Sequence, residues 1–104
     1  MELEKLWRIR VFGIVQGVGL RPTVSRHADA CHIKGNVSTV GPYVEIWAQG
    51  ILKDLRCFKD RIEHQPPRRA VILKLVVEEM EGEERLPAFS DFAIIESEKR
   101  QGDI

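Results

Sequence analysis

Residues 7–22 read WRIRVFGIVQGVGLRP, which combines the pattern of a strand, a glycine-rich loop and the beginning of a helix. Apolar residues and glycine hold the odd positions of the first half, whereas Arg8 and Arg10 face the other way. This alternation predicts a strand over residues 7–15 with one buried face. Pro22 suits the first turn of a helix, where its missing N–H has no intrahelical acceptor to lose. The stretch therefore predicts a strand, a tight loop and a helix in direct succession.

The rest of the chain continues with helix and strand patterns of similar clarity. Apolar residues at helical spacing predict a helix of about ten residues from Leu20, and a second helix over residues 51–62 that ends before two prolines. The expected strands occupy residues 34–39, 43–49, 70–79 and, more weakly, 89–97. This order is βαββαβ with a late extra strand. It predicts an α+β, ferredoxin-like sandwich, in which an antiparallel sheet carries both helices on one face and gains a short C-terminal strand.

Three finer expectations concern the later strands. Gly50 is expected to end the strand at 43–49, and the acidic residues 78–85 are expected to form a solvated turn. Four apolar residues of the strand at 70–79 are expected to share one face: Val71, Leu73, Leu75 and Val77.

The length and the charge of the chain limit the class of protein to which it can belong. The 104 residues have a mass of 11.9 kDa, the size of one domain, which we expect over residues 1–97 with a linker stub or disordered tail at 98–104. Sixteen Lys and Arg balance sixteen Asp and Glu, so the chain lacks a basic field for nucleic acid or a membrane surface. No apolar run approaches the roughly 18 residues of a membrane span, and no export signal is evident, so we expect a cytoplasmic domain.

The loop after the first strand has three features that favour anion binding. Its glycines permit positive φ, so that successive N–H groups can converge on one point. The following helix adds the positive end of its dipole, and Arg21 offers donors that match phosphate oxygens. A plainer interpretation stays open, in which the glycines only turn the chain and Arg21 is solvated. The expected phosphate-binding residues are Val15, Gln16, Gly17, Val18, Gly19, Leu20 and Arg21.

Residues 13–21, GIVQGVGLR, resemble the acylphosphatase signature G-x-V-Q-G-V-x-F-R, with Leu20 in place of the usual Phe. Gly19 and Arg21-Pro22 are similar to one branch of that family, the N-terminal acylphosphatase-like domain of the hydrogenase maturation carbamoyltransferases called HypF. Residues 92–97, FAIIES, resemble the C-terminal end of that domain. The resemblance covers most of the chain and implies the same βαββαβ fold.

The resemblance also implies a chemistry. Acylphosphatases hydrolyse carboxyl-phosphate mixed anhydrides without a metal, another cofactor or a covalent intermediate. The implied ligand is a small acyl phosphate, or inorganic phosphate or sulfate as a bound anion. In the HypF branch the acyl phosphate is carbamoyl phosphate, and the implied partners are the remaining HypF domains and a hydrogenase maturation protein. The loop amides and Arg21 would hold the phosphate, while an Asn on the second strand would orient the attacking water.

The position of that Asn holds a different residue. The family's Asn lies eighteen residues after the Arg, and this position is Thr39. Thr offers one hydroxyl near the backbone on a restricted side chain, whereas Asn offers a donor and an acceptor at longer reach. Asn36 and Ser38 lie at odd offsets from Thr39 and are expected on the opposite strand face. Arg21 and Thr39 are the candidate catalytic residues, and we expect a site that binds anions and hydrolyses slowly.

Two other functions stay open. The first is a non-catalytic anion-binding or docking module of a larger carbamoyltransferase, which the loss of the Asn would suit. The second is a ferredoxin-like RNA-binding domain, which needs exposed aromatic residues on a basic face. Tyr43 and Trp47 share one strand face, but the ordinary reading is a partly covered face, and the zero net charge argues against nucleic acid.

The remaining residues that bind metals in other proteins show no site. The histidines have no metal-ligand spacing, and two cysteines form neither a disulfide framework nor a metal knuckle. Cys31 is expected to be a small buried apolar residue at a helix end, and Cys57 a neighbour of the apolar stripe of the second helix. A disulfide between them is not expected in a cytoplasmic chain.

Overall fold

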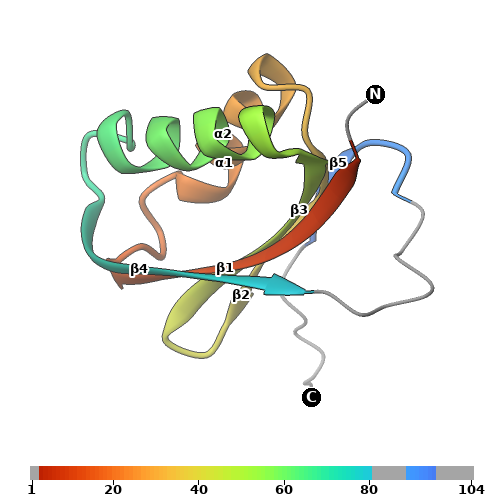
Figure 1. Ribbon diagram of the computed structural model, residues 1–104. Helices are drawn as coiled ribbons and strands as arrows, with labels where there is room; N and C mark the ends of the chain where they lie inside the picture. The colour runs from red at the N-terminus through yellow and green to blue at the C-terminus, as the bar shows by residue number, and fades with distance from the viewer. Residues whose placement is uncertain (1–2, 81–88, 96–104) are drawn as a thin grey trace.

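The computed structural model describes residues 3–80 and 89–95, which form a sheet with two helices on one face (Figure 1). The elements are β1 (Glu4–Ile14), α1 (Leu20–Ala30), β2 (Lys34–Val40), β3 (Tyr43–Ile51), α2 (Leu52–His64), β4 (Val71–Met80) and β5 (Phe92–Ile94). The strand order is β4-β1-β3-β2-β5; the first four strands are antiparallel neighbours, and β5 pairs in parallel with β2. The predicted ferredoxin-like fold with an extra C-terminal strand is confirmed, and β5 makes the sheet mixed.

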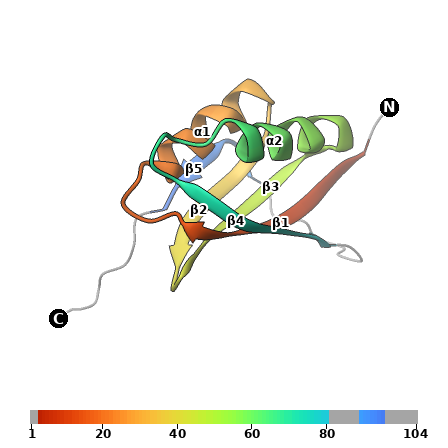
Figure 2. The same ribbon diagram turned by 90° about the vertical axis from the view of Figure 1, so that its left-hand side faces the viewer.

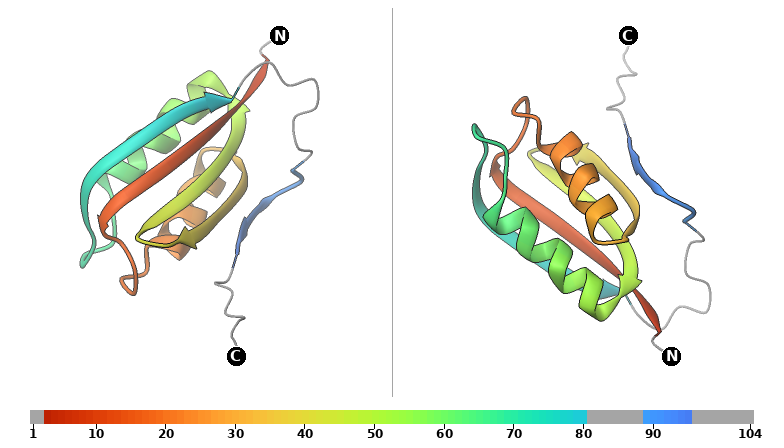
Figure 3. Two further views of the ribbon diagram at one scale, coloured as in Figure 1. Left: turned by 90° about the horizontal axis from the view of Figure 1, so that it is seen from below. Right: turned by 90° about the horizontal axis from the view of Figure 1, so that it is seen from above.

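The core lies between the helices and the sheet face that they cover (Figure 3). Every second residue of β1 from Trp7 to Val11 is buried there, as the alternation predicts. Burying one large apolar side chain contributes about 1.5–3 kcal/mol, so this face fixes where the helices sit. Helix α1 packs on β2 and β5. Helix α2 contributes a stripe of fully buried residues at helical spacing: Leu55, Phe58 and Ile62.

On the opposite sheet face, cations lie over aromatic rings. Arg8 donates a hydrogen bond of 2.6 Å to Glu78, and its guanidinium carbon lies 5.7 Å from the ring centroid of Trp47. Arg10 lies over Tyr43 at 5.8 Å. The hydrogen bond from Arg8 also lowers the pKa of Glu78. Tyr43 and Trp47 are half-buried, as expected for a partly covered face, and within the described ranges no helix lies on this side (Figure 2).

Two strand boundaries differ from the expected ones. β1 begins three residues before the predicted 7–15 and ends at Ile14, because residues from Glu4 onward pair with β3. Gly50 does not end β3, which continues by one residue and leads directly into α2. A Cβ at Gly50 would lie 2.9 Å from Cδ1 of Ile33, so this glycine sits against the side chain of Ile33 and does not reverse the chain.

The C-terminal elements also differ in length from those expected from the sequence. The first three residues of the acidic turn expected at residues 78–85 belong instead to β4, where Glu78 pairs with Arg8. The rest of that turn lies outside the described residues, as do the tail at 98–104 and the expected domain boundary before it. β5 has three residues and is shorter than the strand expected at residues 89–97.

A β-bulge overturns the expected face of β4. The register between β1 and β4 shifts between Phe12 and Gly13, so that Gly13 pairs with Ile72. Ile72 packs against the core together with Leu75 and Val77, whereas Leu73 is 76% exposed and Val71 44% exposed. The prediction that all four apolar residues share one face is therefore wrong for Val71 and Leu73. Gly13 has a φ of 134°, and a Cβ there would lie 2.1 Å from the carbonyl oxygen of Val71. The bulge therefore requires glycine at this position.

Gly13→Ala is expected to lower the free energy of unfolding by about 3 kcal/mol, because the added Cβ meets main-chain atoms of β4. Gly17→Ala is the matched control. Gly17 also has a positive φ, of 72°, but no heavy atom of the described residues lies within 4 Å of the added Cβ, so we expect a loss of about 1 kcal/mol. Urea unfolding measures both losses. Equal losses of unfolding free energy in the two variants would contradict the role given to the close approach between Gly13 and Val71.

Candidate functional site

The loop between β1 and α1 leads into a helix whose N-terminus has no side-chain cap. Gly17 and Gly19 in this loop both adopt the left-handed backbone conformation, with φ of 72° and 81°. Gly19 is the N-cap of α1, and within the described residues no side chain caps this end and no acidic residue occupies the first turn. The first N–H groups of α1 therefore keep their hydrogen-bonding capacity, and the positive end of the helix dipole is not neutralised locally.

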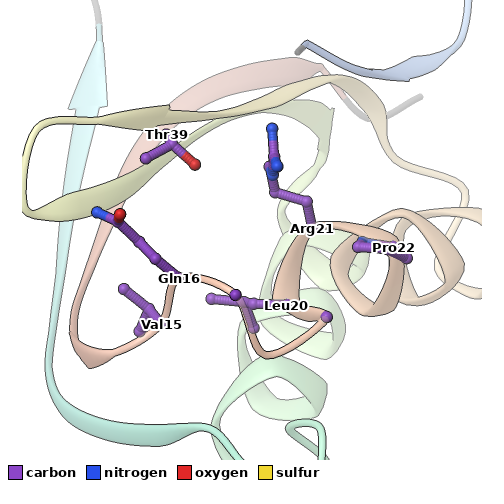
Figure 4. A pocket seen from close by; sticks show the side chains of 8 residues that line it. Val15, Gln16, Leu20, Arg21, Pro22 and Thr39 are labelled. Carbon is purple, nitrogen blue, oxygen red and sulfur yellow. The ribbon is translucent and has the colours of Figure 1, made fainter. Parts of the chain in front are cut away.

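A pocket of about 340 Å³ opens beside this helix end (Figure 4). In Figure 4, Arg21 projects from α1 and Thr39 from β2, with the hydroxyl oxygen of Thr39 on the side that faces Arg21. The loop, the first turn of α1 and the end of β2 together supply the lining residues: Val15, Gln16, Gly17, Gly19, Leu20, Arg21, Pro22 and Thr39. The structure thus brings both candidate catalytic residues and most of the expected phosphate-binding residues to one place.

The side chain of Arg21 is held by the C-terminal strand region. Its Nη1 donates a hydrogen bond of 3.1 Å to the carbonyl oxygen of Ile95, just after β5. A guanidinium has five N–H donors, so one such bond fixes its orientation and leaves others for an anion. Ile95 is itself anchored, because its N–H donates to the carbonyl oxygen of Val37 on β2 at 2.8 Å. Arg21 is therefore positioned through β5 and β2 and not by its own helix alone.

A second contact fixes the loop against the β2–β3 hairpin. Nε2 of Gln16 donates a 2.5 Å hydrogen bond to the carbonyl oxygen of Gly41, in the turn between the two strands. Thr39 lies on β2 two residues before that carbonyl. This bond therefore keeps the loop and the end of β2 together, so that Thr39 stays over the pocket.

The register of β2 separates Thr39 from its polar neighbours. Thr39 pairs with Val44, which is fully buried on the helix-covered face. Asn36 pairs with Trp47 on the other face of the sheet, and Ser38 pairs with a glutamate on that same face. Asn36 and Ser38 are therefore on the side away from the pocket, as their odd offsets predict.

One predicted site residue is not among those that line the pocket, and three contacts were not foreseen. The side chain of Val18 is half-buried against the core, while the expected role of its main-chain N–H as an anion donor stays a prediction. Pro22 lines the pocket, although its position suggested only a helix start. The carbonyls of Gly41 and Ile95 escaped sequence reasoning because main-chain acceptors carry no side-chain signal. The Gln in the signature was the one available hint of the first of these contacts.

The lining residues determine which chemistry is available. Among the described residues around the pocket there is no carboxylate, imidazole or thiol, so a general base is missing from the lining. Arg21 provides a positive charge, the helix end provides N–H donors, and Gln16 and Thr39 provide neutral polar groups. Such a site can hold an anion, stabilise charge on its oxygens and orient a water molecule.

Other kinds of site receive no support from the described residues. Among residues 3–80 and 89–95, no three His, Cys, Asp or Glu side chains gather closely enough to hold a metal ion. None of the helices in those ranges has the length and apolar character needed to cross a membrane.

Comparison with known proteins points to one family. An acylphosphatase family model matches residues 7–94. A probable carbamoyltransferase HypF of Methanocaldococcus jannaschii is 46% identical over 91 residues, a match that covers 88% of this chain and 12% of that protein. The chain therefore spans only a small part of this relative.

Solved structures agree with this comparison. Full-length HypF in its phosphate- and nucleotide-bound form matches with a TM-score of 0.78 and 35% identity, covering 91% of this chain and 12% of that one. The acylphosphatase of Bacillus subtilis matches with a TM-score of 0.79 and 29% identity, covering 88% of this chain and 98% of that one. The same fold thus occurs as a whole protein and as part of a much longer one.

Arg21→Ala is expected to weaken the binding of inorganic phosphate by about tenfold to a hundredfold, because it removes the charged donor of the pocket. Arg26→Ala is the matched control. Arg26 is an exposed arginine of the same helix that bonds to Thr23 and does not line the pocket. Isothermal titration calorimetry at constant ionic strength measures both affinities. An unchanged affinity in Arg21→Ala would refute the assignment of this pocket as the anion site.

Proposed function

This chain belongs to the acylphosphatase family, and we propose that it binds acyl phosphates in the pocket between the β1–α1 loop and β2. The observation that carries the proposal is the convergence of Arg21, Thr39 and the uncapped first turn of α1 on that pocket. No acidic side chain among the lining residues opposes a negatively charged ligand. The pocket therefore has the electrostatic character that a phosphoryl group requires.

In the proposed complex, the phosphoryl oxygens accept hydrogen bonds from the loop and from the first turn of α1. Arg21 supplies further donors, and its bond to Ile95 holds the guanidinium in place before the ligand arrives. Because this positioning precedes binding, little side-chain freedom is lost when the anion enters. The acyl group needs no dedicated charge partner, since it leaves as a carboxylate that water stabilises.

Hydrolysis at this site requires a water molecule placed in line with the bond that breaks. The water oxygen attacks phosphorus, the bond from phosphorus to the acyl oxygen breaks, and the water proton passes to the phosphate product. An acyl phosphate is already activated, so positioning and charge stabilisation supply most of the catalysis without a general base. Thr39 is the residue that would orient the water, and its short side chain makes hydrolysis slow.

The similarity to HypF suggests a particular substrate. Carbamoyl phosphate is a small acyl phosphate, and the relative from Methanocaldococcus jannaschii is named a probable carbamoyltransferase. We therefore propose carbamoyl phosphate as the natural ligand, and residues 1–97 as a domain that works beside the other domains of a carbamoyltransferase in hydrogenase maturation. Because the chain spans 12% of that relative, only anion binding and hydrolysis are assigned to the residues of this pocket.

Thr39 also supports a second candidate function. With the expected Asn absent, the pocket would retain the phosphate without turning it over and would serve as an anion-binding docking module. The two functions share the anion site and differ in the water-orienting residue. A single substitution at that residue therefore separates them.

Thr39→Asn is expected to raise kcat for carbamoyl phosphate and benzoyl phosphate by about tenfold or more, because the longer amide reaches further toward the attacking water. Arg21→Ala is expected to lower kcat/KM by about a hundredfold. Release of inorganic phosphate at saturating substrate measures kcat, and phosphate titration of the same variants reports whether the anion site is intact.

Ser38→Asn is the matched control, since it places the same amide one residue away on the opposite face of β2. Its rate is expected to equal that of the unchanged chain. If the unchanged chain binds phosphate without hydrolysing an acyl phosphate, and hydrolysis appears only in Thr39→Asn, the docking module replaces the hydrolase. If Arg21→Ala binds phosphate and hydrolyses acyl phosphates as the unchanged chain does, this pocket is not the site of either function.

A further inference from the structure

Two cysteines that are distant in sequence meet between the helices. Cys31 follows the last residue of α1, and Cys57 lies in α2. Their Sγ atoms are 2.9 Å apart, in a thiol–thiol contact. Cys31 is buried, with 2% of its surface exposed, whereas Cys57 is classed as exposed. Both are free thiols, and the contact joins the C-terminal end of one helix to the middle of the other.

We propose that Cys31 and Cys57 are a modification site that forms a reversible intramolecular disulfide when the protein meets a low-molecular-weight disulfide. The separation of the two sulfur atoms exceeds the S–S bond length of about 2.05 Å by less than an ångström, so the bond needs only a small shift of two side chains. Cys57 is open to a reagent from solvent, and Cys31 is within reach of Cys57 alone among the described thiols.

The exposure of the two thiols sets the order of the reaction. The Cys57 thiolate attacks one sulfur of the reagent disulfide, forms a mixed disulfide and displaces one reagent thiolate. Cys31 then loses its proton to solvent and attacks Cys57 Sγ, which releases the second reagent thiolate. Two electrons pass to the reagent, which becomes two thiols by taking up the two protons. Burial, followed by the hydrogen bond with Cys57, raises the pKa of Cys31 to about 12, so Cys31 is the second nucleophile and not the first.

The bond would connect α1 to α2, which otherwise meet through packing and through a 2.9 Å hydrogen bond between Nε2 of His27 and the carbonyl oxygen of Gln65, at the C-terminal end of α2. Helix α1 carries Leu20 and Arg21 of the anion pocket at its other end, where Gly19 is its N-cap, and it also contacts α2. A disulfide here closes a loop that contains β2 and β3, which restricts the unfolded chain. The oxidised domain is therefore the more stable form, with the pocket end of α1 left unmodified.

The test is oxidation of the full chain with oxidised glutathione. We expect intact-mass spectrometry to show the loss of two hydrogens, and a thiol assay to show the loss of both thiols without a glutathione adduct. The midpoint of thermal unfolding is expected to rise by about 10 °C and to return on treatment with dithiothreitol. Cys57→Ser changes an exposed residue, and in this variant we expect two-state unfolding with no response to the oxidant.

Three results would overturn the proposal. They are a stable glutathione adduct on Cys57, a covalent dimer on a non-reducing gel, or two thiols that persist in the presence of the reagent. Cys31→Ala provides a second check, because it should arrest the reaction at the mixed disulfide on Cys57. None of these measurements uses an acyl phosphate, so a failed disulfide test leaves the proposed function untouched. A failed hydrolysis or phosphate-binding test likewise leaves the disulfide proposal untouched.

Discussion

The fold depends on a close approach of two main chains at the point where β1 stops pairing regularly with β4. At Gly13 the backbone comes so near to the carbonyl of Val71 that no side chain fits. This contact shifts the register of the sheet and ends β1 one residue later, at Ile14. The chain then turns immediately into the loop that starts α1. The loop that lines the anion pocket therefore begins directly after a close contact between two strands that are distant in sequence.

The pocket is assembled from segments that are joined by two hydrogen bonds to main-chain oxygens. Gln16 connects the loop to the β2–β3 turn, and Arg21 connects α1 to the residue after β5. Each bond joins a signature residue to a part of the chain outside the signature. The short motif thus supplies the loop and a helix end with free N–H groups, and its side chains acquire fixed positions through contacts elsewhere in the folded domain.

Much of the fold was predictable because its determinants are local. The alternation in β1 and the helical spacing in α2 are patterns within single elements, and both elements formed as expected. The bulge was not predictable, since alternation places Leu73 on the buried face while the register of a neighbouring strand exposes it. The meeting of Cys31 and Cys57 likewise depends on how two helices pack. The anion pocket was predictable in part. Its loop is a run of consecutive residues with a recognisable pattern, whereas the position of Thr39 beside that loop depends on how β2 packs in the folded domain.

The two bonds that position the pocket also bear on which substitutions the chain tolerates during evolution. Their acceptors are main-chain carbonyls, which every amino acid possesses, so the identity of the residue at Ile95 can drift while the acceptor persists. What must be preserved there is the pairing of β5 with β2, a property of the backbone. The donors are the side chains of Gln16 and Arg21, and each combines the length and the N–H groups that its bond requires. Substitutions are thus tolerated at the residues that supply the acceptor carbonyls and restricted at the two residues that supply the donor side chains.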